Sequence, residues 1–264
     1  MKIALMDSGI GLLAATAAVR RLRPDADLVL SLDPEGMPWG PRTPEDLTRR
    51  ALTVAEAAAA QGPDALIVGC NTATVHALPA LRARLEPTLP VVGTVPAIKP
   101  AAAGGGTVAI WATPATTGSV YQRGLIRDHA GGVQVAEVPC WGLAEAVEHA
   151  DEAAVDAAVA AAAALTPRDV TTVVLGCTHY ELVADRIRAA VQRPGRPPLA
   201  LHGSAGAVAA QALRRIGERP APDAPAAGTL TVLLSGREGT LPDAALAYEE
   251  GRLLPAAGTA ADLR

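Results

Sequence analysis

The sequence predicts an α/β fold, and two observations lead to that prediction. Short runs rich in Val, Ile and Leu alternate with alanine-rich segments of helical length along the 264 residues, as in a parallel sheet covered by helices. Most of the short runs stop at a cluster of polar residues, and in open α/β sheets ligands bind at the carboxyl ends of strands. The chain has no Phe, so we expect a core of Ala, Val, Leu and Ile.

The individual elements follow from the same pattern. Each expected strand is an apolar or β-branched run that ends at a turn or polar residue, and each expected helix is rich in alanine. In chain order the expected strands are Lys2–Met6, Asp27–Leu32, Ala65–Gly69, Val91–Val95, Thr107–Trp111, Val133–Val138, Thr171–Gly176 and Thr229–Leu234. The expected helices include Leu12–Leu22, Glu45–Gln61 and Glu152–Leu165. The proline-rich stretch Gly217–Gly228 is expected to be an irregular connection.

The two halves of the chain show a weak internal repeat. Ala65–Thr72 and Thr172–His179 each contain an apolar strand, then Gly-Cys, then polar residues where a helix is expected to begin. The repeat predicts two similar lobes, each with one cysteine at a strand end. Proline and glycine in 96–106 suit a crossing between the lobes, and a second crossing is expected near 203–206.

Composition argues against several classes of protein. A net charge of −4 offers no basic surface for phosphates, so no nucleic acid is expected as a partner. We find no apolar stretch of about 18 residues, so no membrane span is expected. The first residues lack the features of a signal peptide, and three cysteines make no disulfide framework. These points predict a cytoplasmic protein with reduced thiols.

The cysteines are the most informative residues. A buried cysteine is most often a small core residue, but Cys70 and Cys177 both follow glycine at an expected helix start, where a thiolate is stabilised. This pairing favours two reactive thiols over a disulfide. Cys177 and His179 lie too close in sequence for the usual zinc-ligand spacing, so no metal is expected. Cys140 lacks a polar helix start after it and is expected to fill the core.

A glycine-rich turn near the N-terminus leaves another class of function open. Asp7-Ser8-Gly9-Ile10-Gly11 opens an expected helix and resembles a dinucleotide-binding turn, which would suit a nucleotide-dependent oxidoreductase. Asp7, however, would place a carboxylate beside the pyrophosphate. The other interpretations are that Asp7 and Ser8 cap the helix, or that Asp7 accepts a proton from a neighbouring thiol.

A series of short motifs, in order and together, carries a family resemblance. They are Asp7–Gly11, Pro38-Trp39-Gly40, Gly69–Ala73, Val95–Ala101, Ala112–Thr116 with Ser119 and Tyr121, Cys140 with Glu148, and Gly176–Tyr180. In these motifs the chain resembles the glutamate racemases, the cofactor-independent two-cysteine type of the aspartate/glutamate racemase superfamily. The resemblance spans nearly the whole chain.

The resemblance implies two pseudo-symmetric lobes, each a mostly parallel sheet covered by helices, with the active site in the cleft between them. Residues 1–94 together with 205–264 would form the first lobe, which carries Asp7 and Cys70. Residues 95–204 would form the second, which carries Cys177 and His179.

The resemblance also implies an isomerase that interconverts L- and D-glutamate without a cofactor and supplies D-glutamate for peptidoglycan. Because one base cannot serve both faces of a held substrate, two thiols would exchange the α-proton. By resemblance, Cys70 would take it from D-glutamate with help from Asp7. Cys177 would take it from L-glutamate with help from His179 and Glu148.

Substrate binding, by the same resemblance, uses small polar groups and helix N-termini. The implied binding residues are Asn71, Thr72, Thr113 and Thr116 for the α-carboxylate, Ser8 and Thr178 near the amino group, and Pro38, Trp39 and Gly40 for the side-chain carboxylate. Capping a helix is the alternative role for each Ser and Thr.

Three positions depart from the family pattern. Trp39 stands where the family usually has Tyr, Leu12 where it has Gly, and Gly203 where it has an acidic residue before Ser204. Trp39 predicts an altered side-chain pocket, which keeps open a racemase or isomerase of the same superfamily for aspartate or another small acid. A racemase-like binding protein with weak catalysis is a further alternative. The expected partner is a small amino acid, and the resemblance allows a homodimer.

Overall fold

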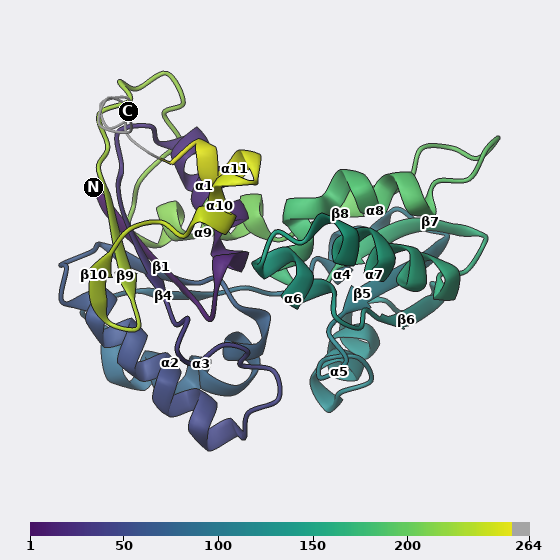
Figure 1. Ribbon diagram of the computed structural model, residues 1–264, viewed down its shortest axis with the longest axis horizontal. Helices are drawn as coiled ribbons and strands as arrows, with labels where there is room; N and C mark the ends of the chain where they lie inside the picture. The colour runs from purple at the N-terminus through teal and green to yellow at the C-terminus, as the bar shows by residue number, and fades with distance from the viewer. Residues whose placement is uncertain (255–264) are drawn as a thin grey trace. The chain divides into compact units, whose positions relative to one another are not determined.

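The computed structural model describes residues 1–254 and divides into two compact units (Figure 1). Unit 1 is formed by Met1–Thr94 together with the chain from Ala205 onward, and unit 2 by Val95–Ser204. The part of the predicted first lobe that covers residues 255–264 lies outside the described residues.

Unit 1 is built on a six-stranded sheet with the order β10-β9-β2-β1-β3-β4. All neighbouring strands are parallel except β9 and β10, which form an antiparallel pair. The strands are β1 (Lys2–Asp7), β2 (Asp27–Leu32), β3 (Ala65–Val68), β4 (Val91–Gly93), β9 (Leu230–Leu234) and β10 (Arg237–Gly239). The C-terminal segment therefore returns to complete the sheet that the N-terminal segment begins.

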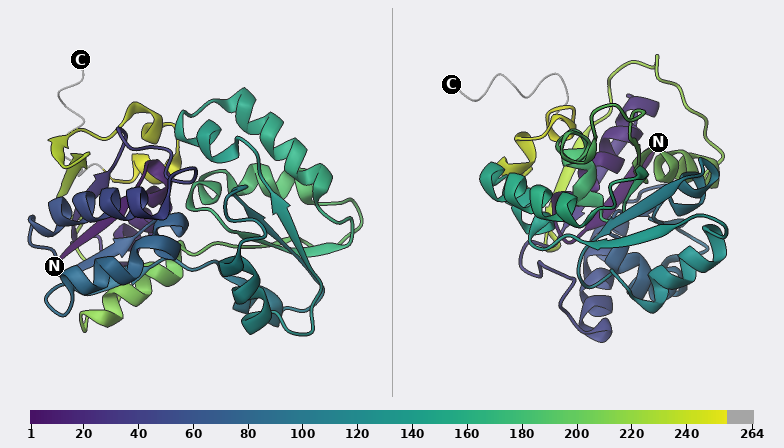
Figure 2. Two further views of the ribbon diagram at one scale, coloured as in Figure 1. Left: turned by 90° about the horizontal axis from the view of Figure 1, so that it is seen from below. Right: turned by 90° about the vertical axis from the view of Figure 1, so that its right-hand side faces the viewer.

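Helices cover both faces of this sheet. On one face α2 (Pro44–Ala59) packs beside α3 (Asn71–Leu85), as Figures 1 and 2 show. On the other, α1 (Leu13–Leu22) packs against α9 (Ala205–Arg215), with the short helices α10 (Asp243–Leu246) and α11 (Glu249–Arg252) nearby. A 3₁₀ turn, η1 (Ile10–Leu12), joins β1 to α1.

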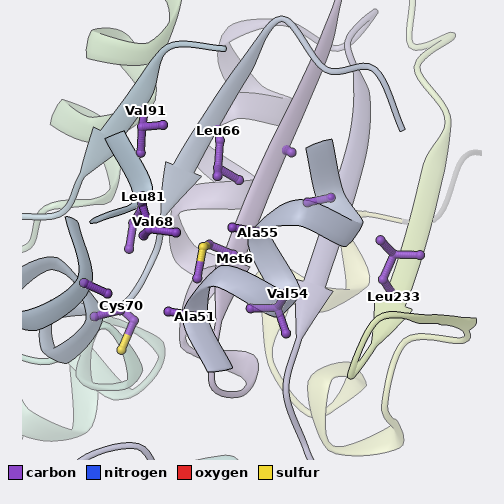
Figure 3. Packing of buried hydrophobic residues seen from close by; sticks show 14 of the residues in the cluster. Met6, Ala51, Val54, Ala55, Leu66, Val68, Cys70, Leu81, Val91 and Leu233 are labelled. Atoms are coloured by element: carbon purple, nitrogen blue, oxygen red, sulfur yellow. The ribbon is translucent and has the colours of Figure 1, made fainter. Parts of the chain in front are cut away.

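The core between the sheet and helices α2 and α3 consists of aliphatic side chains with few aromatic ones (Figure 3). Burial of such side chains stabilises the unit by roughly 25 cal/mol per Å² of apolar surface removed from water. Cys70 lies at the edge of this cluster, with its sulfur pointing away from Met6 and Val68. The thiol therefore lies at the boundary of the core, just beyond the carboxyl end of β3.

Unit 2 has a four-stranded, fully parallel sheet with the order β6-β5-β7-β8. Its strands are β5 (Thr107–Ala112), β6 (Val135–Pro139), β7 (Val170–Leu175) and β8 (Ala200–His202). Its helices are α4 (Ile98–Ala103), α5 (Val120–His129), α6 (Leu143–Glu148), α7 (Glu152–Leu165), the 3₁₀ helix η2 (Thr178–Val183) and α8 (Ala184–Val191). Helices α4 and α5 share a core with β5, while α6, α7 and α8 pack in sequence against one another.

The predicted α/β class is confirmed, and the order β2-β1-β3-β4 in unit 1 corresponds to β6-β5-β7-β8 in unit 2. Each predicted strand is present, with ends that shift by at most a few residues, and the 217–228 stretch is irregular as expected. The short strands β8 and β10 were not predicted. Among residues 1–254, the helices are all too short or too polar to cross a membrane, and no group of His, Cys, Asp and Glu side chains is arranged to hold a metal ion.

Candidate active site

The predicted site residues of unit 1 gather at the carboxyl ends of β1, β2 and β3. Strands β1 and β3 pair in parallel with Met6 opposite Val68, and the Gly69 N–H continues the ladder by donating to the Met6 carbonyl oxygen at 2.8 Å. Asp7, at the end of β1, and Cys70, just after β3, therefore leave the sheet at the same edge.

Asp7 is fully buried and Ser8 nearly so. The carboxylate oxygen Oδ1 of Asp7 accepts a hydrogen bond from the Ser8 backbone N–H at 2.6 Å, and the Ser8 hydroxyl lies 3.3 Å from the same oxygen. A buried carboxylate is costly unless it is hydrogen-bonded, and these donors satisfy its Oδ1 oxygen.

Cys70 is 7% exposed and immediately precedes α3, a helix of 15 residues. Asn71 and Thr72 form the first turn of that helix, with Asn71 buried and Thr72 half-buried. The positive end of the helix dipole therefore lies at the Cys70 thiol and favours negative charge on its sulfur.

Pro38, Trp39 and Gly40 lie in the connection from β2 to α2. Trp39 is buried, at 2% exposure, and its indole Nε1–H donates to the Asp33 carboxylate at 2.9 Å. Pro38 is exposed and Gly40 is half-buried. The only polar atom of the indole is thus used within the protein.

In unit 2 three predicted catalytic residues are brought together in a chain. The Cys177 sulfur lies 3.8 Å from Nδ1 of His179, and Nε2 of His179 lies 2.9 Å from Oε2 of Glu148. His179 is 5% exposed, and Glu148 is the last residue of α6. The carboxylate fixes the imidazole so that its other nitrogen faces the thiol.

A helix begins after Cys177, as the repeat predicts, but its first six residues form the 3₁₀ helix η2. This 3₁₀ helix leads directly into α8 at Ala184, and the hydrogen bonds described place His179 beside the thiol. The two thiols are placed alike in the fold but differ in their surroundings.

Cys140 differs from both. It is 2% exposed, its thiol lies 3.6 Å from the Val138 carbonyl oxygen, and its own carbonyl accepts from the Tyr180 hydroxyl at 3.4 Å. Burial, and then the neighbouring Cys177, raises the pKa of the Cys140 thiol. A thiol of this kind carries no useful fraction of thiolate.

The remaining predicted binding residues of unit 2 lie at the ends of β5 and β7. The hydroxyls of Thr113 and Thr116 are 3.2 Å apart in the turn that follows β5, and Thr178 is buried beside Cys177. The side chain of Ser119 caps α5, so capping that helix is not the role of either threonine.

The glycines before Cys70 and Cys177 permit close packing. A Cβ on Gly176 would lie 2.7 Å from the Trp111 carbonyl oxygen, and one on Gly69 would lie 3.0 Å from Cβ of Leu12. The approach of Gly69 to Leu12 also explains why Leu12 can stand where the family has glycine. The αR backbone conformation of Leu12 does not require glycine, and its side chain has room because Gly69 carries no side chain.

The departure at Gly203 is compensated within unit 2. Oε1 of Glu181 accepts from both the backbone N–H and the hydroxyl of Ser204, at 2.7 and 2.9 Å, and a Cβ on Gly203 would come within 2.2 Å of Oε2 of Glu181. The Glu181 carboxylate therefore occupies the space beside Ser204. Sequence reasoning missed Glu181 because nothing local indicates this pairing.

Sequence reasoning also missed Asp33, the partner of Trp39. The available signal was its place directly after a predicted strand, as for Asp7. Chemically, unit 1 offers a thiol beside a helix N-terminus with a buried carboxylate at the same sheet edge. Unit 2 offers a thiol with an imidazole and a carboxylate in line, so each unit supplies one group able to accept and return a proton.

Comparison with known proteins agrees with this chemistry. Residues 12–212 match the family model described as Asp/Glu/Hydantoin racemase. The chain is 40% identical over 195 residues to a glutamate racemase of Roseiflexus sp. (strain RS-1), covering 71% of this chain and 70% of that protein. It is 36% identical over 226 residues to that of Pseudomonas entomophila, covering 82% of each.

A solved structure of a glutamate racemase has a similar fold. The structure of Escherichia coli glutamate racemase in complex with L-glutamate and the activator UDP-MurNAc-ala is similar with a TM-score of 0.74. That match has 26% sequence identity and covers 93% of this chain and 91% of that one.

Proposed function

This chain belongs to the Asp/Glu/hydantoin racemase family, and we propose that within it the protein is a glutamate racemase that interconverts L- and D-glutamate. The observation that carries the proposal is its similarity, over most of both sequences, to proteins named glutamate racemase. The cysteines at corresponding positions in the two units, Cys70 after β3 and Cys177 after β7, support the same activity.

The proposed mechanism uses two thiols in opposite protonation states. Starting from L-glutamate, the Cys177 thiolate removes the α-proton, and the Cys70 thiol gives its own proton to the opposite face of the carbanion. D-Glutamate forms, Cys177 becomes a thiol, and Cys70 becomes a thiolate. The reverse reaction begins from that state, so atoms and charges balance without a cofactor.

The neighbours of each thiol have distinct proposed roles. His179, with its Nδ1 3.8 Å from the Cys177 sulfur, exchanges a proton with that thiol, and Glu148 holds the imidazole in place. A carboxylate beside Cys70 would by charge alone disfavour a thiolate. Asp7 is therefore proposed to relay a proton and to attract the substrate ammonium group, while the N-terminus of α3 favours the thiolate.

The substrate carboxylates are proposed to bind to uncharged donors. Side chains of small polar residues and backbone N–H groups would hold them, as oriented dipoles hold developing charge in other enzymes. The proposed binding residues are Asn71, Thr72, Thr113 and Thr116 for the α-carboxylate, Ser8 and Thr178 near the amino group, and the Pro38–Gly40 segment for the side-chain carboxylate.

The proposed role is to supply D-glutamate for peptidoglycan. Trp39, in place of the usual Tyr, motivates one alternative, an action on aspartate or another small acid. A racemase-like binding protein with weak catalysis is the other. The homodimer that the resemblance allows is tested by light scattering of the purified protein.

The activity is tested in deuterium oxide with L-glutamate and, separately, L-aspartate, with no added cofactor. With two bases on opposite faces, early product carries deuterium at Cα while the recovered substrate keeps its proton. Deuterium entering aspartate but not glutamate would assign the other substrate. Absence of exchange from both would leave the binding protein as the better description, and loss of turnover with a chelator would contradict the metal-free mechanism.

The site is tested with matched cysteine variants. Cys70→Ala and Cys177→Ala are each expected to abolish racemisation, followed by circular dichroism from either enantiomer, because each removes one of the two bases. Cys140→Ala is the control and should retain nearly full activity, since that thiol is buried. An equal loss in all three variants would show that the site is wrongly assigned.

A further inference from the structure

Asp33 joins separate elements of unit 1 through its side chain. It directly follows β2 and is 2% exposed. Its Oδ2 accepts from Trp39 Nε1 at 2.9 Å and from Arg50 Nε at 2.6 Å. Its Oδ1 accepts from Arg50 Nη2 at 2.8 Å and from the Ser235 hydroxyl at 2.9 Å. Both oxygens are thus satisfied, by the β2–α2 connection, by α2 and by the turn after β9.

The backbone of Asp33 ties the same region to the end of β1. Its N–H donates to the Ser8 carbonyl oxygen at 3.2 Å, and its carbonyl oxygen accepts from the N–H groups of Gly36 and Met37 at 2.9 and 3.0 Å. A Cβ on Gly36 would lie 1.9 Å from both the Asp33 carboxylate and Arg50 Nε. The turn that leads to Pro38 is therefore wrapped tightly around the Asp33–Arg50 pair.

This arrangement determines what Trp39 can do. The indole is buried and its single donor is bound by Asp33, so it has no polar atom left for a substrate. Any hydrogen bond from this segment to a carboxylate must come from backbone N–H groups, whose direction depends on how the indole is anchored.

We propose that Asp33 is a positioning residue for substrate recognition: by holding the Trp39 indole, it fixes the backbone N–H groups of Trp39 and Gly40 that receive the side-chain carboxylate of glutamate. Asp33 itself does not touch the substrate. The inference rests on the proposed function, because it explains how that proposed site binds the side-chain carboxylate of glutamate.

The negative charge of Asp33 strengthens its hydrogen bond to the Trp39 indole. Burial raises the pKa of this carboxyl, but the hydrogen bonds from Arg50, Trp39 and Ser235 outweigh burial, so its pKa is lowered. The hydrogen bond from Arg50 to Asp33 also raises the pKa of the Arg50 guanidinium, so the charged form of Arg50 is favoured as well. Hydrogen bonds to a charged acceptor are stronger than neutral ones, so the carboxylate restrains the indole more than an amide would.

The test compares Asp33→Asn and Trp39→Phe with the wild-type protein. Because the far carboxylate binds alike in the ground state and the transition state, loss of its positioning should raise KM for glutamate about tenfold, with kcat changed less than about twofold. A tenfold change corresponds to about 1.4 kcal/mol. Arg49→Ala, on the same helix but pairing with Asp46, is the control and should leave both constants unchanged.

The double variant separates positioning from general stability. If Asp33 acts through Trp39, the KM of Asp33→Asn/Trp39→Phe will equal that of the single variants instead of rising by the product of their effects. Thermal unfolding of each variant, with assays well below the transition, ensures that only folded protein is compared. A purely structural role would lower the transition temperature and leave KM unchanged.

Each outcome is decisive. An unchanged KM in folded Asp33→Asn, or multiplicative effects in the double variant, would overturn the inference. If Asp33→Asn fails to fold, an unchanged KM in folded Trp39→Phe overturns it and a tenfold rise supports it, because Phe keeps an aromatic ring at this buried position but cannot donate to Asp33. A wild-type protein without glutamate racemisation would instead refute the proposed function.

Discussion

At the scale of single residues, the two proposed catalytic cysteines differ in the groups that surround them. Cys70 lies at the start of a 15-residue helix, whereas Cys177 faces an imidazole that a carboxylate holds in place. An equilibrium between enantiomers has a constant of unity, so unequal stabilisation cannot favour either product.

Glu148→Gln tests the imidazole arrangement. An amide lacks the negative charge that orients His179, so we expect kcat/KM to fall by about ten- to a hundredfold, since a hydrogen bond to a charged group contributes about 1.5–3 kcal/mol. The fall should be equal for L- and D-glutamate because their equilibrium constant is unity, and circular dichroism in both directions measures it. Glu145→Gln, exposed on the same helix, is the control. Full activity in Glu148→Gln would remove that residue from the site.

Asp33 also predicts a pH dependence of stability. Its pKa is lower in the folded protein than the value of about 3.9 expected when unfolded, so its stabilising effect is complete above that value and is lost as the pH falls through the folded pKa. Urea unfolding should therefore show a deficit in Asp33→Asn that is constant near neutral pH and shrinks below about pH 4. Asp223→Asn, which changes an exposed residue, should show none. A deficit independent of pH would mean that shape, not charge, is what matters at Asp33.

At the scale of elements, the strand ends depend on glycine. A Cβ on Gly176 would meet the Trp111 backbone oxygen at 2.7 Å, and a backbone atom cannot move aside cheaply. Gly176→Ala should therefore lower the free energy of unfolding by about 1–3 kcal/mol, measured with urea. Gly206→Ala is the contrasting control, since Gly206 lies in α9 with nothing near its added Cβ. That substitution should be neutral or stabilise the protein by up to about 1 kcal/mol, and an equal loss in both variants would contradict the packing argument.

The sequence predicted the elements whose signals are local. The leucine-rich run Asp27–Leu32 has the bounds of β2, and the alanine-rich segment Glu152–Leu165 has those of α7. The three-residue strand β8 follows two prolines and has too few residues to show a period, so it was missed. The repeat correctly located both cysteines after strands, but it could not show that the helical segment after Cys177 begins as the 3₁₀ helix η2.

The site was predictable where it depends on motifs and unpredictable where it depends on distant partners. His179 and Glu148 were assigned to one thiol by resemblance, and their side chains do lie together. Asp33 receives a hydrogen bond from Ser235, 202 residues away in the sequence. Such a contact leaves no periodic or local trace, and it becomes visible only once the C-terminal strand has returned to the first sheet.

At the scale of the whole molecule, unit 2 is an insertion between two parts of unit 1. Unit 2 is continuous and has its own four-stranded sheet and core, whereas unit 1 needs segments from both sides of it. In particular, β2 pairs with β9 from Leu28 opposite Leu230 to Leu32 opposite Leu234, and α1 packs on α9. Without the C-terminal segment, β2 would become an exposed apolar edge.

This topology predicts different behaviour for the separated parts. Residues 95–204 expressed alone should fold, with helical circular dichroism and cooperative thermal unfolding, because no strand or core helix of that unit lies outside the range. Residues 1–94 alone should not, because they lack β9 and α9. A chain in which a flexible Gly/Ser linker replaces residues 95–204 restores both elements and should unfold cooperatively again. Cooperative unfolding of residues 1–94 alone would show that the returning segment is dispensable, and it would remove the Ser235 contact from the account of how Asp33 is held.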